Sequence, residues 1–150
     1  MITIRRATAN DLDWIVSELK KFAHFYQSNQ FLVAEDSDYV RSNLLNMFNQ
    51  HLFLVAEKDG VGLVGLIAGL YVRHFFNPNI RLLSETFWWV PEEHRGSRAG
   101  LMLLEAFTEW GKENADWITF ALEENSPVKD KCLLNRGYRL QERSYLMEVQ

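Results

Sequence analysis

The stretch ETFWWVPEEHRGSRAGLMLLEAF, residues 85–107, decides how the rest of the chain is interpreted. It predicts a strand rich in aromatic residues, a turn with two arginines and two glycines, and then an amphipathic helix. A helix start leaves backbone N–H groups without partners and points the positive end of the helix dipole outward. Gly96 and Gly100 would let a bulky anion approach the main chain. The pattern predicts a phosphate-binding turn, although the two glycines alone fit an ordinary strand-to-helix turn equally well.

Two familiar nucleotide-binding motifs do not fit this turn. The chain contains no GxxxxGK[ST] sequence, which a P-loop requires. A GxGxxG dinucleotide loop would need a third glycine and usually an early strand–helix–strand unit. The predicted anion site therefore belongs to neither of these folds.

The composition predicts one ordered globular domain covering residues 1–150. The chain is 47% hydrophobic and 24% charged, with only 3 prolines and 8 glycines, which is unlike a disordered chain. Its net charge of -4 argues against nucleic acid as the main ligand, because such proteins neutralise many phosphates.

Other classes are excluded by simple counts. Cys132 is the only cysteine, so no intramolecular disulfide can form, and the four histidines lack metal-ligand spacing. We therefore expect no metal. The longest apolar run, residues 61–72, contains three glycines and is too short to span a bilayer, so we expect a cytoplasmic protein without membrane association.

Hydrophobic periodicity around the central stretch predicts a mixed α+β fold with one sheet. Asp59-Gly60 between two apolar runs is a strong hairpin signal, Ser126-Pro127 predicts a helix start, and Gly137 predicts that helix's end. The predicted strands are 2–5, 52–57, 63–72, 81–90, 117–122, 138–140 and 145–149, and the predicted helices are 12–25, 37–49, 98–112 and 126–137.

The turn resembles motif A of the GNAT family of N-acetyltransferases, whose signature is [Q/R]xxGx[G/A]. Here it is written Arg95-Gly96-Ser97-Arg98-Ala99-Gly100, with Arg98 where the family usually has glycine. The resemblance extends over nearly the whole chain, from the first strand and two helices to the closing NRGYRL at residues 135–140. Short proteins of this kind also occur in bacteriophage genomes.

The resemblance implies a GNAT-like acyl-CoA N-acyltransferase fold: a mixed, mostly antiparallel sheet with helices on both faces and a splay between strands four and five. Acetyl-coenzyme A, the implied cosubstrate, would lie in that opening. Trp88 and Val90 would meet its pantetheine arm. The implied coenzyme-binding residues further comprise Arg95, Gly96, Ser97, Arg98, Ala99, Gly100 and Asn125.

The activity that the resemblance implies is direct attack of an amine on the acetyl group. Glu85 is the candidate base that takes the ammonium proton, with water held by Ser84 or Thr86 as the alternative. Glu85 has the wrong strand parity relative to Val90 unless a β-bulge intervenes, as the family commonly has in this strand. The Val90 N–H is the candidate donor to the developing oxyanion. No general acid is assigned, because Leu133 occupies the position where many family members carry tyrosine.

The acceptor is not specified by the sequence and could be a small molecule or a protein amine; a homodimer also stays open. Phe25, Tyr26 and Phe31 are the candidate acceptor-binding residues, while core packing explains them equally well. Two other classes remain open. One is a coenzyme-binding sensor or recruiting module without catalysis, and the other is a non-catalytic inhibitor that binds a host protein through residues 22–31.

Overall fold

The computed structural model describes residues 1–26 and 37–149, and its centre is a five-stranded sheet with strand order β1-β2-β3-β4-β5. Neighbouring strands run antiparallel from β1 to β4, and β5 is parallel to β4. This is the mixed sheet that the sequence predicts. The strands are β1 (Ile2–Arg6), β2 (Leu52–Lys58), β3 (Gly62–Arg73), β4 (Arg81–Trp89) and β5 (Trp117–Thr119).

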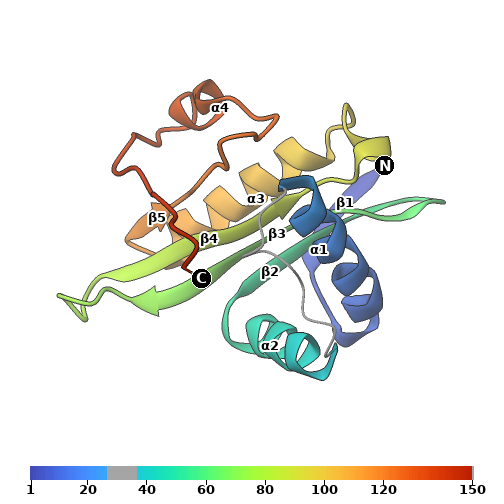
Figure 1. Ribbon diagram of the computed structural model, residues 1–150, viewed down its shortest axis with the longest axis horizontal. Coiled ribbons are helices and arrows are strands. Elements are labelled where there is room, and N and C mark those ends of the chain that lie inside the picture. Colours follow the sequence, from blue (N-terminus) through green and yellow to red (C-terminus); the bar gives the residue numbers. More distant parts are fainter. Residues whose placement is uncertain (27–36, 150) are drawn as a thin grey trace.

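Helices cover both faces of this sheet (Figure 1). The helices α1 and α2 pack on one face, where their apolar stripes meet Phe53, Val55 and Leu66. The helix α3 packs on the opposite face against Leu54, Ile67 and other strand residues. The helix bounds are α1 (Leu12–Tyr26), α2 (Ser37–Gln50), α3 (Ala99–Asn114) and α4 (Asp130–Leu134).

The α1 face contains a buried carboxylate that the sequence analysis did not single out. Glu18 is only 3% exposed, yet it accepts hydrogen bonds from Trp89 Nε1 at 3.2 Å and from Lys21 Nζ at 2.9 Å. Each carboxylate oxygen therefore has a donor, as a buried charge requires. The contact ties the middle of α1 to the end of β4, next to the predicted site.

A β-bulge interrupts the pairing of β3 with β4. Phe87 lies opposite Ala68 and Glu85 lies opposite Gly69, so Thr86 is the extra residue. Its hydroxyl donates to the Ala68 carbonyl at 3.1 Å. One extra residue reverses the alternation of side chains between the two faces of the sheet. Residues on opposite sides of the bulge that a regular strand would place on opposite faces therefore lie on the same face.

The sheet splays open between β4 and β5. Their parallel pairing covers only three residue pairs and ends at Ser84 opposite Thr119. Beyond that point β4 continues for five residues, to Trp89, without β5 beside it. The sequence analysis predicted a longer strand, 117–122; the observed strand ends earlier because its partner diverges.

Two predictions for the C-terminal part are wrong: the start of the last helix and the two closing strands. The last helix begins at Asp130 and not at Ser126-Pro127, because the Ser126 hydroxyl accepts the Val128 N–H at 3.1 Å in a local turn. Gly137, with φ +92°, follows the helix end as predicted.

The segments 138–140 and 145–149 are not strands. Their alternating pattern needs a partner strand, and Tyr145, Met147 and Val149 are all more than 80% exposed instead of packing on the sheet. The short β5 offers only three residues on which a further ladder could form.

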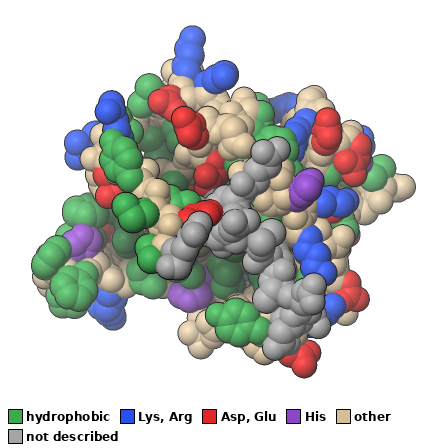
Figure 2. Space-filling view, in the orientation of Figure 1, with side chains coloured by type: hydrophobic (Ala, Val, Ile, Leu, Met, Phe, Trp, Pro, Cys, Tyr) green, Lys and Arg blue, Asp and Glu red, His purple; other side chains and the backbone are tan. Residues whose placement is uncertain are grey.

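The turn between β3 and β4 carries an exposed aromatic tip. Phe75 and Phe76 are 91% and 86% exposed, and His74 meets Trp117 edge-on with ring centroids 5.0 Å apart. Hydrophobic side chains gather over this end of the hairpin at the lower left of Figure 2. The tip lies at the end of β4 remote from the bulge and from the splay.

Candidate active site

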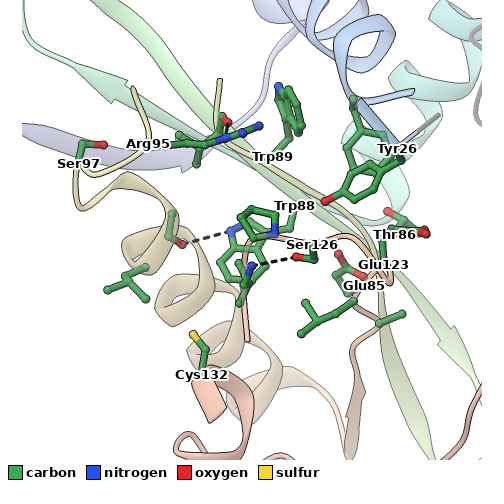
Figure 3. A pocket seen from close by; sticks show the side chains of 18 of the residues that line it. Tyr26, Glu85, Thr86, Trp88, Trp89, Arg95, Ser97, Glu123, Ser126 and Cys132 are labelled. Atoms are coloured by element: carbon green, nitrogen blue, oxygen red, sulfur yellow. Dashed lines mark hydrogen bonds between the residues drawn. The ribbon is translucent and has the colours of Figure 1, made fainter. Parts of the chain in front are cut away.

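One cavity of about 340 Å³ lies where the splay opens, between the second half of β4, the start of α3 and the segment after β5 (Figure 3). Residues from elements far apart in the sequence form its walls. They are Phe22, Tyr26, Glu85, Thr86, Trp88, Trp89, Val90, Arg95, Gly96, Ser97, Gly100, Leu101, Ala121, Leu122, Glu123, Ser126, Pro127, Val128 and Cys132.

The turn before α3 leaves backbone amides available at one end of this cavity. The first helical hydrogen bond runs from Met102 N–H to the Arg98 carbonyl at 3.0 Å, so the amides of Gly100 and Leu101 precede it. Such amides have no carbonyl partner within their own helix, and the helix dipole adds positive potential there. Both residues line the cavity, and the local chemistry therefore suits an anion.

The backbone conformation of Gly96 and the hydroxyl of Ser97 shape this turn. Gly96 adopts a left-handed conformation with φ +94°, and no atom lies within 4 Å of where a Cβ would stand. Ser97 Oγ donates to the His94 carbonyl at 2.7 Å and accepts the Ala99 N–H at 3.3 Å. The amide of Ala99 is thus already paired, while the surface beside Gly96 is open.

Trp88 forms the wall between β4 and α3. Its Nε1 donates to the Gly100 carbonyl at 3.2 Å, and its ring meets Phe120 edge-on with centroids 5.4 Å apart. Val90 Cγ2 lies 3.5 Å from the point where a Gly100 Cβ would stand. These contacts hold the end of β4 at a fixed distance from the first turn of α3.

Arg95 is the only cationic side chain among the described residues that line the cavity. Its Nε donates to the Val90 carbonyl at 3.0 Å. Its guanidinium lies 4.7 Å from the Phe25 ring centroid and 4.8 Å from that of Trp89. The side chain therefore connects the turn to α1 by cation–π contacts, and its charge faces the α1 side.

The bulge brings Glu85 to the α3 face of the sheet, together with Trp88. Leu83 and Trp88 both pack in the α3-side core although they are five residues apart, which a regular strand would not allow. Glu85 is two residues from Leu83 and so shares its face. The carboxylate accepts the Ala121 backbone N–H across the splay, and burial raises the pKa of Glu85 to about 8.

A second carboxylate lies close to the first. Glu123, from the segment after β5, raises the pKa of Glu85 further by like-charge repulsion, and its own pKa is raised by desolvation. Tyr26 reaches this end of the cavity from α1, where its hydroxyl bonds with the Ser126 side chain and burial raises its pKa. Figure 3 shows these four side chains converging on one end of the cavity, with Cys132 at the other end.

Most of the predicted site residues line this cavity. Those that do are Tyr26, Glu85, Trp88, Val90, Arg95, Gly96, Ser97 and Gly100. Phe25 stands behind Arg95, Ala99 is buried under the helix start, and Arg98 and Asn125 are exposed outside the described lining. Phe31 lies outside the described residues.

From the segment after β5 the sequence analysis expected only Asn125 at the site, and it missed the residues of this region that line the cavity. Glu123, Ser126 and Cys132 all line the cavity. The signal was present: this polar segment follows the strand parallel to β4, and segments at the carboxyl ends of parallel strands commonly form binding sites. Among the described residues, no group of three or more His, Cys, Asp or Glu is placed to hold a metal ion. In the described part of the chain, the helices are too short or too polar to cross a bilayer.

Comparison with known sequences gives one family. The model described as the acetyltransferase (GNAT) family matches residues 16–128, which include the whole of the cavity lining except Cys132. No curated protein sequence matches the chain significantly.

Solved structures share the fold at low sequence identity. A predicted acetyltransferase from Clostridium acetobutylicum, solved with acetyl-CoA, matches with TM-score 0.75 and 16% identity over 100% of this chain and 96% of that chain. A transcriptional regulator from Bacillus halodurans matches with TM-score 0.77 and 19% identity over 99% and 100%. An aminoglycoside acetyltransferase from an uncultured soil metagenomic sample matches with TM-score 0.72 and 16% identity over 99% and 97%.

Proposed function

The chain belongs to the GNAT acetyltransferase family, as the match over residues 16–128 shows, and from this premise we propose that it transfers an acetyl group from acetyl-coenzyme A to a primary amine. The observation that carries the proposal is the cavity itself, which joins a carboxylate of raised pKa to the open first turn of α3. A base and an anion site in one cavity are what this reaction needs.

The residues at the start of α3 fit a coenzyme. Its pyrophosphate needs unpaired N–H donors and room for close approach, which the amides of Gly100 and Leu101 and the open surface at Gly96 provide. Arg98, exposed at the same turn, would add positive charge toward the phosphates. The pantetheine arm would follow Trp88 and Val90 into the splay, where β4 is paired with β3 on one side and no longer has β5 on the other.

The acceptor amine would enter at the other end of the cavity, beside Glu85. A protonated amine cannot attack, so the carboxylate of Glu85 first takes its proton. The neutral nitrogen then attacks the thioester carbonyl carbon: the C–N bond forms, the C–S bond breaks, and the second nitrogen proton leaves with the coenzyme as its thiol. The Val90 N–H, at the end of β4, would donate to the negative charge that develops on the carbonyl oxygen.

No side chain is assigned as proton donor to the departing thiolate. Tyr138 lies near the position of the family's usual tyrosine, but its hydroxyl is bonded to Thr108 at 2.8 Å and it is not among the described residues of the cavity lining. A thiolate is already a good leaving group, so water can supply this proton. The attack by the amine would then be the step that depends most on the protein.

Thermal unfolding with acetyl-coenzyme A tests the first half of the proposal. At about 100 times its dissociation constant, the coenzyme should stabilise the native state by about 2.7 kcal/mol, which raises the melting temperature by several degrees. An unchanged midpoint at millimolar acetyl-coenzyme A would contradict the proposed function.

Thiol release tests the second half. Acetyl-coenzyme A plus a panel of primary amines should release free coenzyme thiol in proportion to acetylated product, and the panel should include small amines and peptides with free lysine. Coenzyme-dependent stabilisation without thiol release for any amine would instead support the non-catalytic coenzyme-binding module.

A further inference from the structure

The acceptor end of the cavity carries two carboxyl groups and one cationic side chain among its described lining residues. Glu85 and Glu123 both line it, and Arg95 is the only described cation in the lining. The Arg95 guanidinium is occupied by the Val90 carbonyl and by two aromatic rings on the α1 side. It therefore does not neutralise the pair of carboxylates by direct contact.

The two carboxylates differ in how they are held. Glu85 accepts the Ala121 N–H and stands at the bulge, in position to take a proton from the reacting nitrogen. The Glu123 carboxylate forms no hydrogen bond or ion pair with any residue in the described ranges 1–26 and 37–149. Its side chain lines the cavity wall and is exposed, without a cation beside it among the described residues, so its negative charge is open to a cationic ligand that enters the cavity.

The rest of this end is apolar and aromatic. Phe22, Tyr26, Trp88 and Trp89 face the cavity, and aromatic faces favour both alkyl chains and ammonium groups. An acceptor with an anionic second group would meet repulsion from Glu123, and a monoamine whose nitrogen lies at Glu85 would leave Glu123 unpaired.

We propose that the acceptor is a small alkyl amine with a second cationic nitrogen, and that Glu123 is the residue that binds this second nitrogen while Glu85 serves the reacting one. The simplest members of this class are linear diamines. This inference rests on the proposed acetyl transfer for the role of Glu85, but the binding preference at Glu123 can be measured without turnover.

Calorimetric titration provides that measurement. Pentane-1,5-diamine, pentylamine and 5-aminopentanoate each have five carbons and an amine at one end, and the other end is a cationic ammonium, an uncharged methyl and an anionic carboxylate, respectively. Each is titrated at pH 7 into the protein, both alone and saturated with coenzyme A. The diamine should bind about tenfold more tightly than the monoamine, and the amino acid should bind most weakly.

Substitution of Glu123 distinguishes a specific site for the second nitrogen from a general attraction of cationic amines to an acidic protein. Glu123→Gln should remove the diamine preference while leaving monoamine affinity within about twofold. Glu124→Gln is the matched control, because this neighbouring glutamate is exposed like Glu123 but lies outside the described cavity lining; it should keep the preference.

Equal affinity of the parent protein for diamine and monoamine would overturn the inference, as would a preference that survives in Glu123→Gln. Failure of the proposed function has a different signature, namely no stabilisation by acetyl-coenzyme A or no thiol release. A diamine preference that depends on Glu123 would stand even in that case.

Discussion

Glu85 lines the cavity because β4 contains a single extra residue, Thr86, at the bulge. Without Thr86 as a bulge, its side chain would point to the α1 face, away from Trp88. On the α3 face it meets the Ala121 amide and the carboxylate of Glu123, and desolvation there raises its pKa to about 8. The side chain is therefore largely protonated at pH 7 in the absence of ligand, and a cationic amine beside it would favour its charged, basic form.

Replacement of this carboxylate should impair chemistry and leave coenzyme binding intact. We expect Glu85→Gln to lower kcat at neutral pH by about 100-fold, because the amine then loses its base. The parent acts on the protonated amine through charged Glu85, whereas the variant depends on amine that is already neutral. The ratio of parent to variant kcat/KM should therefore stay about constant below pH 8, where the charged carboxylate and the neutral amine both increase with pH, and fall by about tenfold per pH unit above it.

Steady-state rates between pH 6 and 9, together with coenzyme titrations of both proteins, check this expectation. Glu124→Gln serves as the control and should behave like the parent, since it removes a nearby exposed charge outside the described lining. A ratio near one at every pH, or one that does not fall above pH 8, would point to unassisted attack or to another base, with water held by Ser84 or Thr86 the next to test.

At the scale of elements, the coenzyme end depends on how closely the end of β4 approaches the first turn of α3. The Trp88 indole bonds the Gly100 carbonyl, and Val90 packs beside the same residue. Gly100 has only one atom within 4 Å of its Cβ position, Val90 Cγ2 at 3.5 Å. A side chain there is tolerated by the fold and would project toward the space that the coenzyme needs.

Gly100→Val should therefore weaken coenzyme binding selectively. We expect the dissociation constant of acetyl-coenzyme A to rise at least about tenfold, while the free energy of unfolding falls by no more than about 1 kcal/mol. Glu113→Val, an exposed position near the other end of α3, matches the cost of a β-branched residue in this helix and should bind coenzyme normally. Equal coenzyme affinity of Gly100→Val and the parent would show that this turn binds no phosphate.

At the scale of the whole molecule, close contact between sheet and α3 supports the splayed arrangement. Gly65 and Gly69 of β3 lie under Leu103 and Phe107 of α3. A Cβ at Gly65 would lie 2.9 Å from Leu103 Cδ1, and a Cβ at Gly69 would lie 2.9 Å from the Phe107 ring. At Gly69 the Ser84 carbonyl of β4 is also 2.9 Å away, so no side-chain rotation relieves the clash. The position of α3 relative to β4, and hence the width of the cavity, depends on these two glycines.

Gly69→Ala should be destabilising for this reason. We expect a loss of about 2–3 kcal/mol in the free energy of unfolding, because backbone or helix must move to accept one methyl group. Urea unfolding measures it. Gly100→Ala is the matched glycine-to-alanine change, with its nearest contact at 3.5 Å, and should be neutral or slightly stabilising. A Gly69→Ala midpoint equal to that of the parent would mean that the layers are not this tightly packed.

The sequence by itself indicated the family, the order of the elements through α3 and β5, and most of the residues that line the cavity near the start of α3. These features are local: the helix periodicity, the Asp59-Gly60 hairpin and the turn at residues 95–100 each lie within a short stretch of chain. The bulge was suggested by the family resemblance, because Glu85 and Val90 have the wrong parity in a regular strand, and the structure has it at Thr86.

The tertiary structure alone decided what depends on contacts between distant segments. The Arg95 side chain rests on Phe25 of α1, and Glu123 comes next to Glu85 only because β5 pairs with β4 and then diverges. The alternating pattern of residues 145–149 did not become a strand, since a strand needs a partner edge that the pattern cannot supply. Local sequence sets backbone conformation, whereas the charge and shape of the acceptor end arise from neighbours that only folding brings together.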